Sequence, residues 1–159
     1  MMKQSLKTGF SFGLMSGVIT PLGLMVGLNA GTHSRLAVIG GIVTIAVADA
    51  LSDALGIHIA EESKNSGNVS DIWEATIATF VAKFLIALTF VVPVLLLPLV
   101  AAMMVSVIWG LTLLAGLSYF LARAQQIPAW KVIAEHVVIG VSVVAITHYV
   151  GAWVHSAFG

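Results

Sequence analysis

The sequence predicts an all-α integral membrane protein, with five transmembrane helices in a single domain over residues 1–159. Apolar residues make up 59% of the chain and charged residues 9%, and the mean hydropathy is +1.05. Soluble domains carry about 25% charged residues, so this chain lacks the polar surface that a soluble globule needs. Its apolar runs are long and continuous, without the alternation that strands of a membrane β-barrel require, which favours helices.

Five apolar runs supply the spans, since a helix that crosses the hydrocarbon needs about 20 mainly apolar residues. Polar or proline-containing segments separate the runs at residues 31–35, 61–71, 97–98 and 123–128. The predicted spans cover residues 8–30, 36–60, 73–97, 100–122 and 130–155. We expect Pro93 to kink the third span and Pro98 to end it.

Basic residues predict the orientation of the chain in the membrane. With five spans, all clearly placed basic residues except Arg35 fall on one side; these are Lys3, Lys7, Lys64, Arg123 and Lys131. The positive-inside rule then predicts a cytoplasmic N-terminus and a C-terminus that is outside or lumenal, in the plasma membrane if the cell is prokaryotic. The formal net charge is zero, so we expect no basic surface and no nucleic-acid partner.

The first span contains two runs of glycine at four-residue intervals. The first run is Gly9, Gly13 and Gly17, and the second is Gly23, Gly27 and Gly31. Small residues at this spacing let the backbones of membrane helices approach closely. Two interpretations stay open: the glycines pack against other helices of the same subunit, or they form a contact between two subunits.

Asp49 and Asp53 are ionisable residues inside the second span, and Ser52 lies beside them. A spacing of four places both carboxylates on one face of a helix. Because like charges repel strongly in a low dielectric, the pair needs a bridging cation or a proton on one member. The pattern predicts a site that exchanges a metal ion for protons. The alternative is a structural pair, either protonated or bound to Lys83.

A second group of possible ligands lies at the cytoplasmic end of the second span. His58, Glu61 and Glu62 are spaced by three and four residues, and the chain has no cysteine to supply thiolate ligands. Imidazole and carboxylate groups suit borderline or hard divalent ions. A metal entry site and a solvated helix end are equally good interpretations. We expect Lys83 to pair with Glu135 instead, because both lie at similar depths near the cytoplasmic face.

Three stretches of the chain together resemble the vacuolar iron transporter family. They are residues 14–28, 50–56 and 139–151, and residues 90–98 are also similar to that family's third span. The resemblance covers nearly the whole chain in order, with the same number of spans. It implies a homodimer of five-helix subunits, with the ion path between the first two helices of each subunit. It also implies export of Fe²⁺, and often Mn²⁺, from the cytoplasm in exchange for protons.

The chain departs from that family at two ligand positions and in one loop. Ser16 stands where the family has an aspartate, Asp53 stands where it has a methionine, and about a dozen residues replace its long cytoplasmic helices. Ser16 lies about 12 Å and Asp49 about 16 Å from the cytoplasmic ends of their predicted spans, at 1.5 Å per residue, so the two are at similar depths. We therefore expect Asp49 to supply the missing carboxylate. Asp53 in place of a thioether favours oxygen-preferring ions such as Mn²⁺ and Fe²⁺.

The sequence thus predicts a non-enzymatic exporter of Fe²⁺ or Mn²⁺, coupled to protons, embedded in lipid and working as a homodimer. The metal ion is the substrate, and no resident cofactor is expected. The predicted metal ligands are Ser16, Asp49, Ser52, Asp53, His58, Glu61 and Glu62. One alternative is a non-transporting membrane scaffold with buried structural acid pairs. Another is a metal-dependent membrane enzyme, although no spacing places a nucleophile beside a base.

Overall fold

The computed structural model describes residues 4–64 and 68–159, and 92% of these described residues are helical. The helices are α1 (Gln4–Thr32), α2 (Arg35–Glu62), α3 (Val69–Thr89), α4 (Val91–Leu96), α5 (Leu99–Gln125) and α6 (Ala129–Phe158). No strand occurs within those two described ranges. The predicted all-α class is therefore confirmed.

Within the described part of the chain, five helical segments are long and apolar enough to cross a membrane, as the sequence predicts, and these are features of a multi-pass membrane protein. Helices α3 and α4 together form the third segment, Val69–Leu96. The observed segments extend beyond the predicted spans by between one and four residues at nearly every end. The polar residues at these ends continue the helices, which apolar run lengths alone do not show.

The break between α3 and α4 has the expected cause. Pro93 lacks an N–H, so the carbonyl of Thr89 loses the donor that a continuous helix provides, and α3 ends at that residue. Helix α4 ends before Pro98, where Leu97 is extended with φ −117° and ψ 158°. A proline disfavours helical geometry in the residue before it, which explains why α4 ends there. The predicted break at Pro93 and the predicted helix end at Pro98 are both confirmed.

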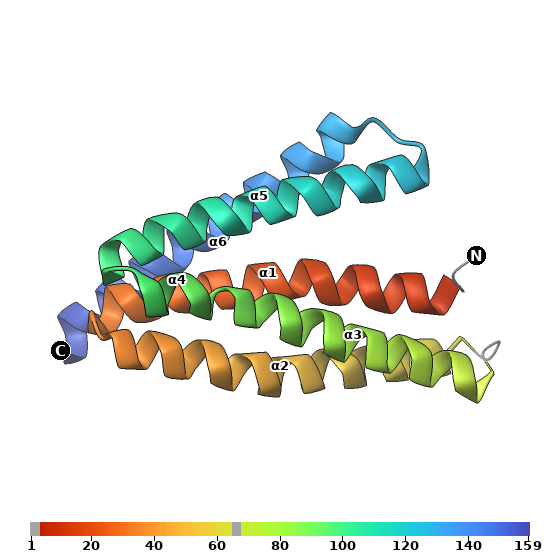
Figure 1. Cartoon of the computed structure of the whole chain (residues 1–159), viewed down its shortest axis with the longest axis horizontal. Coiled ribbons are helices and arrows are strands. Elements are labelled where there is room, and N and C mark those ends of the chain that lie inside the picture. Colours follow the sequence, from red (N-terminus) through yellow and green to blue (C-terminus); the bar gives the residue numbers. More distant parts are fainter. Residues whose placement is uncertain (1–3, 65–67) are drawn as a thin grey trace.

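Helix α1 is the central helix of the fold (Figure 1). It packs against α2 and α3 along its length, and these three helices form one compact group. Helices α5 and α6 form an antiparallel pair that contacts α1 and diverges from it toward the end that carries the N-terminus. The two chain ends lie at opposite ends of the bundle, as five spans require.

The glycines of α1 form close contacts inside the subunit. A Cβ on Gly9 or Gly13 would lie 2.3 Å from Ala75 O or 2.5 Å from Thr79 O, both on α3. The second run faces α6, where Gly151 leaves room for the backbone of Gly27. Of the two interpretations of the glycine runs, the structure therefore shows packing within one subunit.

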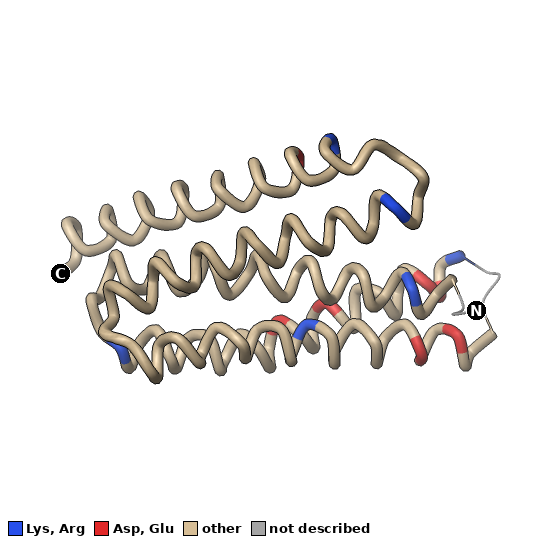
Figure 2. The backbone as a smooth tube through the Cα atoms, turned by 45° about the horizontal axis from the view of Figure 1, so that its top comes forward, with Lys and Arg blue, Asp and Glu red and all other residues tan. Residues whose placement is uncertain are grey.

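The apolar core occupies the half of the bundle that lies farther from the N-terminus. Its largest members include Leu22 and Met25 from α1, Ile42 from α2, Phe90 at the α3–α4 break and Leu114 from α5. All five side chains are fully buried. Apart from Arg35, the charged positions of α2 and α3 lie in the other half, between the middle of these helices and the end that carries the N-terminus (Figure 2).

Candidate functional site

A cluster of charged side chains lies between α1, α2 and α3, halfway along the bundle. The Lys83 ammonium on α3 forms ion pairs with Oδ2 of Asp49 and Oδ2 of Asp53 on α2. It also donates to Oγ of Ser16 on α1 over 2.9 Å, and Ser16 donates to Asp53 Oδ2 over 2.6 Å. These four residues are called the midspan cluster below. Figure 2 shows basic and acidic positions meeting near the middle of the bundle.

Close packing of α1 on α3 brings Lys83 into the midspan cluster. Gly17 permits this packing, because a Cβ there would lie 3.0 Å from Lys83 Cα and Lys83 O. One turn before Lys83, the buried Thr79 hydroxyl lies 3.0 Å from Gly9 O and 2.8 Å from Ala75 O. The small residues of α1 thus fix the depth and direction of the lysine.

The carboxylates of the cluster are more open than its ammonium. The side chains of Asp49 and Asp53 are 27% and 20% exposed, whereas that of Lys83 is 2% exposed. Ser52 lies next to Asp53 on the exposed face of α2. Lys83 and Ser16 contact the two aspartates through the Oδ2 atoms, so the Oδ1 atoms take no part in these contacts. The cluster therefore presents carboxylate oxygens to the outside of the subunit and keeps the lysine behind them.

The structure corrects the expected partner of Lys83. Glu135 is exposed on α6, and α6 packs against α1 and α5, while Lys83 lies on the face of α3 that meets α1 and α2. The predicted Lys83–Glu135 ion pair is therefore wrong. The pairing of Lys83 with Asp49 and Asp53, the structural alternative of the sequence analysis, is what the structure contains.

The second predicted group at the end of α2 does not converge on one point. His58 Nδ1 lies 3.0 Å from Thr76 Oγ1 on α3, and its ring packs edge-on against Trp73. Glu61 is buried and accepts a bond of 2.6 Å from Lys64, one turn further along the chain. Glu62 is exposed. A metal entry site at these residues stays a prediction.

Neither group forms a complete metal site within one subunit. Across residues 4–64 and 68–159, no three His, Asp or Glu side chains gather in a way that holds a metal ion. Two carboxylates and two hydroxyls, from Ser16 and Ser52, are all that the midspan cluster and its neighbour on α2 offer. A divalent ion at this point therefore needs further ligands, from water or from a second subunit.

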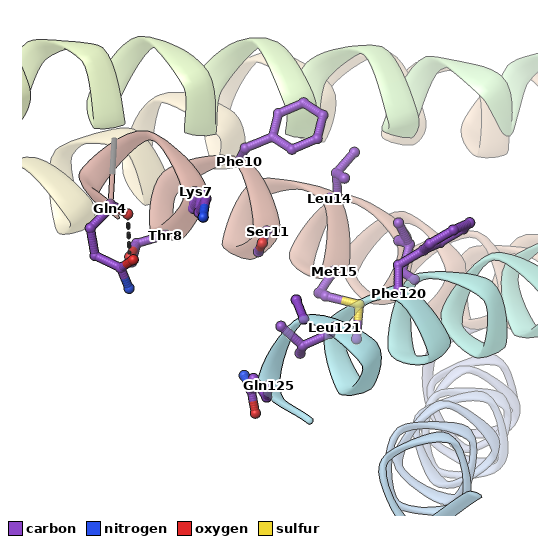
Figure 3. A pocket seen from close by; sticks show the side chains of 12 residues that line it. Gln4, Lys7, Thr8, Phe10, Ser11, Leu14, Met15, Phe120, Leu121 and Gln125 are labelled. Carbon is purple, nitrogen blue, oxygen red and sulfur yellow. Dashed lines mark hydrogen bonds between the residues drawn. The ribbon is translucent and has the colours of Figure 1, made fainter. Parts of the chain in front are cut away.

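A groove opens between α1 and α5 where these two helices diverge (Figure 3). Its volume is about 650 Å³, and Lys7, Ser11 and Met15 line it from α1. Leu121 and Gln125 line it from α5. None of the four midspan residues lines this groove, because their side chains meet between α1, α2 and α3. The groove and the charged cluster are separate features.

A further polar contact ties α5 to α6 away from the cluster. His136 Nδ1 lies 2.8 Å from Ser118 Oγ, and the buried Ser118 hydroxyl donates to Leu114 O in its own helix. The contact between Ser118 and His136 links α5 to α6.

The function of this chain is inferred from its fold and from the midspan cluster. No family model matches the sequence, and neither a curated protein nor a solved structure matches it. What the geometry provides is a group of charges in the middle of a helical bundle, with two carboxylates on its open side.

Proposed function

We propose that the protein moves a divalent transition-metal ion, Fe²⁺ or Mn²⁺, out of the cytoplasm in exchange for protons. Asp49 and Asp53 form the transport site in this proposal, with Ser16 and Ser52 as neighbouring oxygen ligands. One observation carries it: two partly exposed carboxylates lie one turn apart in the middle of a helix long enough to span a membrane. Ionisable side chains at such depth are costly, and they commonly mark the path of an ion or a proton.

The charge of the midspan cluster supports a cation as its substrate. Two ionised carboxylates and one ammonium sum to one net negative charge, from the residues Asp49, Asp53 and Lys83. An uncompensated charge in a low-dielectric interior is strongly unfavourable. A proton or a metal ion at the open carboxylate oxygens supplies the missing positive charge. Competition between these two cations for one site is the basis of the proposed exchange.

A second copy of the chain supplies the remaining ligands in this proposal. The exposed face of α2 carries small residues at every fourth position beside the cluster; these are Gly40, Thr44, Ala48, Ser52, Gly56 and Ala60. A Cβ on Gly40 or Gly56 would meet nothing within 4 Å, so this face is unpacked within the subunit. Small residues at this spacing favour helix association in membranes. Two copies packed along α2 bring four carboxylates toward one axis.

Transport in proteoliposomes tests the proposal. Vesicles that contain the wild-type protein and a pH-sensitive dye should take up Mn²⁺ or Fe²⁺ and move protons in the opposite direction. Asp49→Asn and Asp53→Asn should each abolish both signals, because the site loses the charge that holds the cation. Glu135→Gln is the matched control, since Glu135 is a carboxylate on a spanning helix outside the cluster. Wild-type rates in both aspartate variants would contradict the proposed site.

A structural role is the second candidate, and a specific observation favours it. Lys83 binds both carboxylates and thereby ties α2 to α3 without any metal ion. A membrane scaffold held together by this cluster predicts that Asp53→Asn lowers stability in detergent. It also predicts that the wild-type protein moves neither metal nor protons, so the proteoliposome experiment separates the two candidates.

A further inference from the structure

Lys83 is the least expected member of the midspan cluster. Among the residues that the structure describes, it is the largest fully buried side chain. Its stem is enclosed where α3 packs on α1 at Gly17, and its ammonium contacts Ser16, Asp49 and Asp53. The Lys83 ammonium pairs with both carboxylates. It therefore occupies the position beside them that a bound cation needs.

The aspartate side chains of the cluster are partly exposed, whereas the lysine is buried. Lys83 contacts the Oδ2 atoms of Asp49 and Asp53, so the Oδ1 atoms are the carboxylate oxygens that an arriving ion finds without a bond to the lysine. A metal ion that binds both oxygens of a carboxylate, or draws the two carboxylates together, must displace the ammonium. Ser16 Oγ remains within 2.9 Å as a partner for the displaced lysine.

We propose that Lys83 is a tethered cation that competes with the transported ion for Asp49 and Asp53. This inference rests on the proposed function, and it names the group that controls the affinity of the site. Without metal, the lysine holds the two carboxylates in the bilayer. When metal arrives, the displaced ammonium stays tethered a few ångströms away, and its positive charge weakens metal binding. A transport site has to bind its ion weakly enough to release it, and Lys83 provides that limit.

The sign of the effect on affinity separates this role from a structural one. Lys83→Met keeps a long unbranched side chain and removes the charge, so it should tighten Mn²⁺ binding by about tenfold or more and slow release in proteoliposomes. Lys83→Arg should weaken binding, because a guanidinium grips carboxylates with two parallel bonds. Lys131→Met, at the exposed start of α6, is the matched control and should leave affinity unchanged. A purely structural lysine predicts weaker binding in Lys83→Met.

A comparison of Asp53→Asn with the double variant tests the inference even if the Lys83→Met protein alone does not fold. Asp53→Asn leaves one carboxylate and one ammonium, a neutral cluster that should bind Mn²⁺ at least about tenfold more weakly than the wild type. Adding Lys83→Met to Asp53→Asn returns the net charge to minus one and should restore much of that loss. Mn²⁺ affinity is measured by calorimetry on the full chain in detergent, with folding checked by gel filtration.

The outcomes distinguish the inference from the proposed function. Tighter binding by Lys83→Met, or restored binding by the double variant, supports the tethered cation. If the wild type binds Mn²⁺ and the folded Lys83→Met proteins bind it equally or more weakly, the inference is wrong and the proposed function stands. If neither the wild type nor any variant binds Mn²⁺, the proposed function fails together with the inference.

Discussion

At the scale of single residues, Ser16 connects the two charged helices of the midspan cluster. Its hydroxyl accepts a hydrogen bond from Lys83 and donates one to Asp53, so a single oxygen links α1 to both α2 and α3. Hydrogen bonds between membrane helices are worth about 0.6 to 2 kcal/mol each. A serine thus adds modest stability while it orients two larger charges.

Ser16→Ala should lower the free energy of unfolding by about 1 kcal/mol, because Asp53 loses a neutral donor while the Lys83 ion pairs remain. Ser142→Ala is the matched control, since the Ser142 hydroxyl bonds only to Val138 O in its own helix. Unfolding in detergent, followed by circular dichroism, measures both variants. Equal losses in the two would show that the Ser16 bridge adds nothing.

Moving a carboxylate from α2 to α1 tests the depth argument behind the proposed site. Ser16 forms hydrogen bonds with the Asp53 and Lys83 side chains, so an aspartate at position 16 lies within reach of the same lysine. Asp49→Ala alone should abolish metal-driven proton movement, and Ser16→Asp combined with Asp49→Ala should restore part of it. Proteoliposome flux measures both. No recovery in a folded double variant would mean that position 16 cannot replace position 49.

The composition of the midspan cluster was only partly predictable. The spacing of Asp49 and Asp53 places them on one face, and counting residues from the ends of the predicted spans brings Ser16 to their level. The same count places Lys83 ten residues from the end of its span and Asp49 eleven residues from the end of the neighbouring span. By the same count Glu135 lies only five residues inside its span, so Lys83 is closer in depth to Asp49 than to Glu135. Depth alone does not decide the pairing, because the sequence does not show which helices pack against α3.

At the scale of helices, the two glycine runs of α1 explain why this helix is central. Within each run the spacing is four residues, but six residues separate Gly17 from Gly23. Corresponding glycines of the two runs are 14 residues apart, which separates the runs by about 21 Å along the helix but rotates them by only about 40°. The first run meets α3 and the second, farther along α1, meets α6. The sequence shows two sites for close packing on nearly one side of the helix, and the partner of each site comes only from the three-dimensional fold.

Two glycine substitutions on different helices separate subunit folding from association. Gly13→Leu should destabilise the subunit by at least about 2 kcal/mol, because even its Cβ would lie 2.5 Å from Thr79 O. Gly56→Leu adds the same side chain to open space on α2, so the subunit should stay folded while the proposed dimer dissociates. Thermal unfolding and light scattering in detergent measure the two effects.

Two results would overturn these expectations. A Gly13→Leu protein as stable as the wild type would show that α1 and α3 do not need their close contact. A dimeric Gly56→Leu protein would place any subunit interface away from the small-residue face of α2. Because a leucine has higher helix propensity than a glycine, neither substitution weakens its own helix, and both results report packing.

At the scale of the whole molecule, the number of spans was predictable and their tilts were not. Run lengths and the prolines at 93 and 98 predict five segments and one break, because the bilayer thickness fixes the length of a spanning helix. The divergence of α5 from α1, which opens the groove beside Lys7 and Met15, has no counterpart in the sequence pattern. Tilt depends on side-chain packing between neighbouring helices, which a single sequence does not specify.

The charges at the two ends of the bundle predict its orientation, and the orientation decides the direction of transport. The end with the N-terminus carries Lys7, Lys64, Arg123 and Lys131, and Arg35 lies at the opposite end, where it donates to Leu97 O over 2.6 Å. Basic residues near the ends of spans are retained on the cytoplasmic side. In the proposed transport, with this predicted orientation, metal enters from the basic end, leaves at the end with the C-terminus and is exported.

Cysteine labelling tests that orientation without background, because the chain contains no cysteine. Ser63→Cys and Ser156→Cys each replace an exposed residue at opposite ends of the bundle. An impermeant maleimide should label Ser156→Cys in intact bacterial cells and Ser63→Cys only after the membrane is opened. The reverse pattern would place the basic end outside, and a protein in that orientation would carry metal into the cytoplasm if it moves ions from the basic end. Since the same midspan cluster would serve both directions, labelling decides the direction independently of the site.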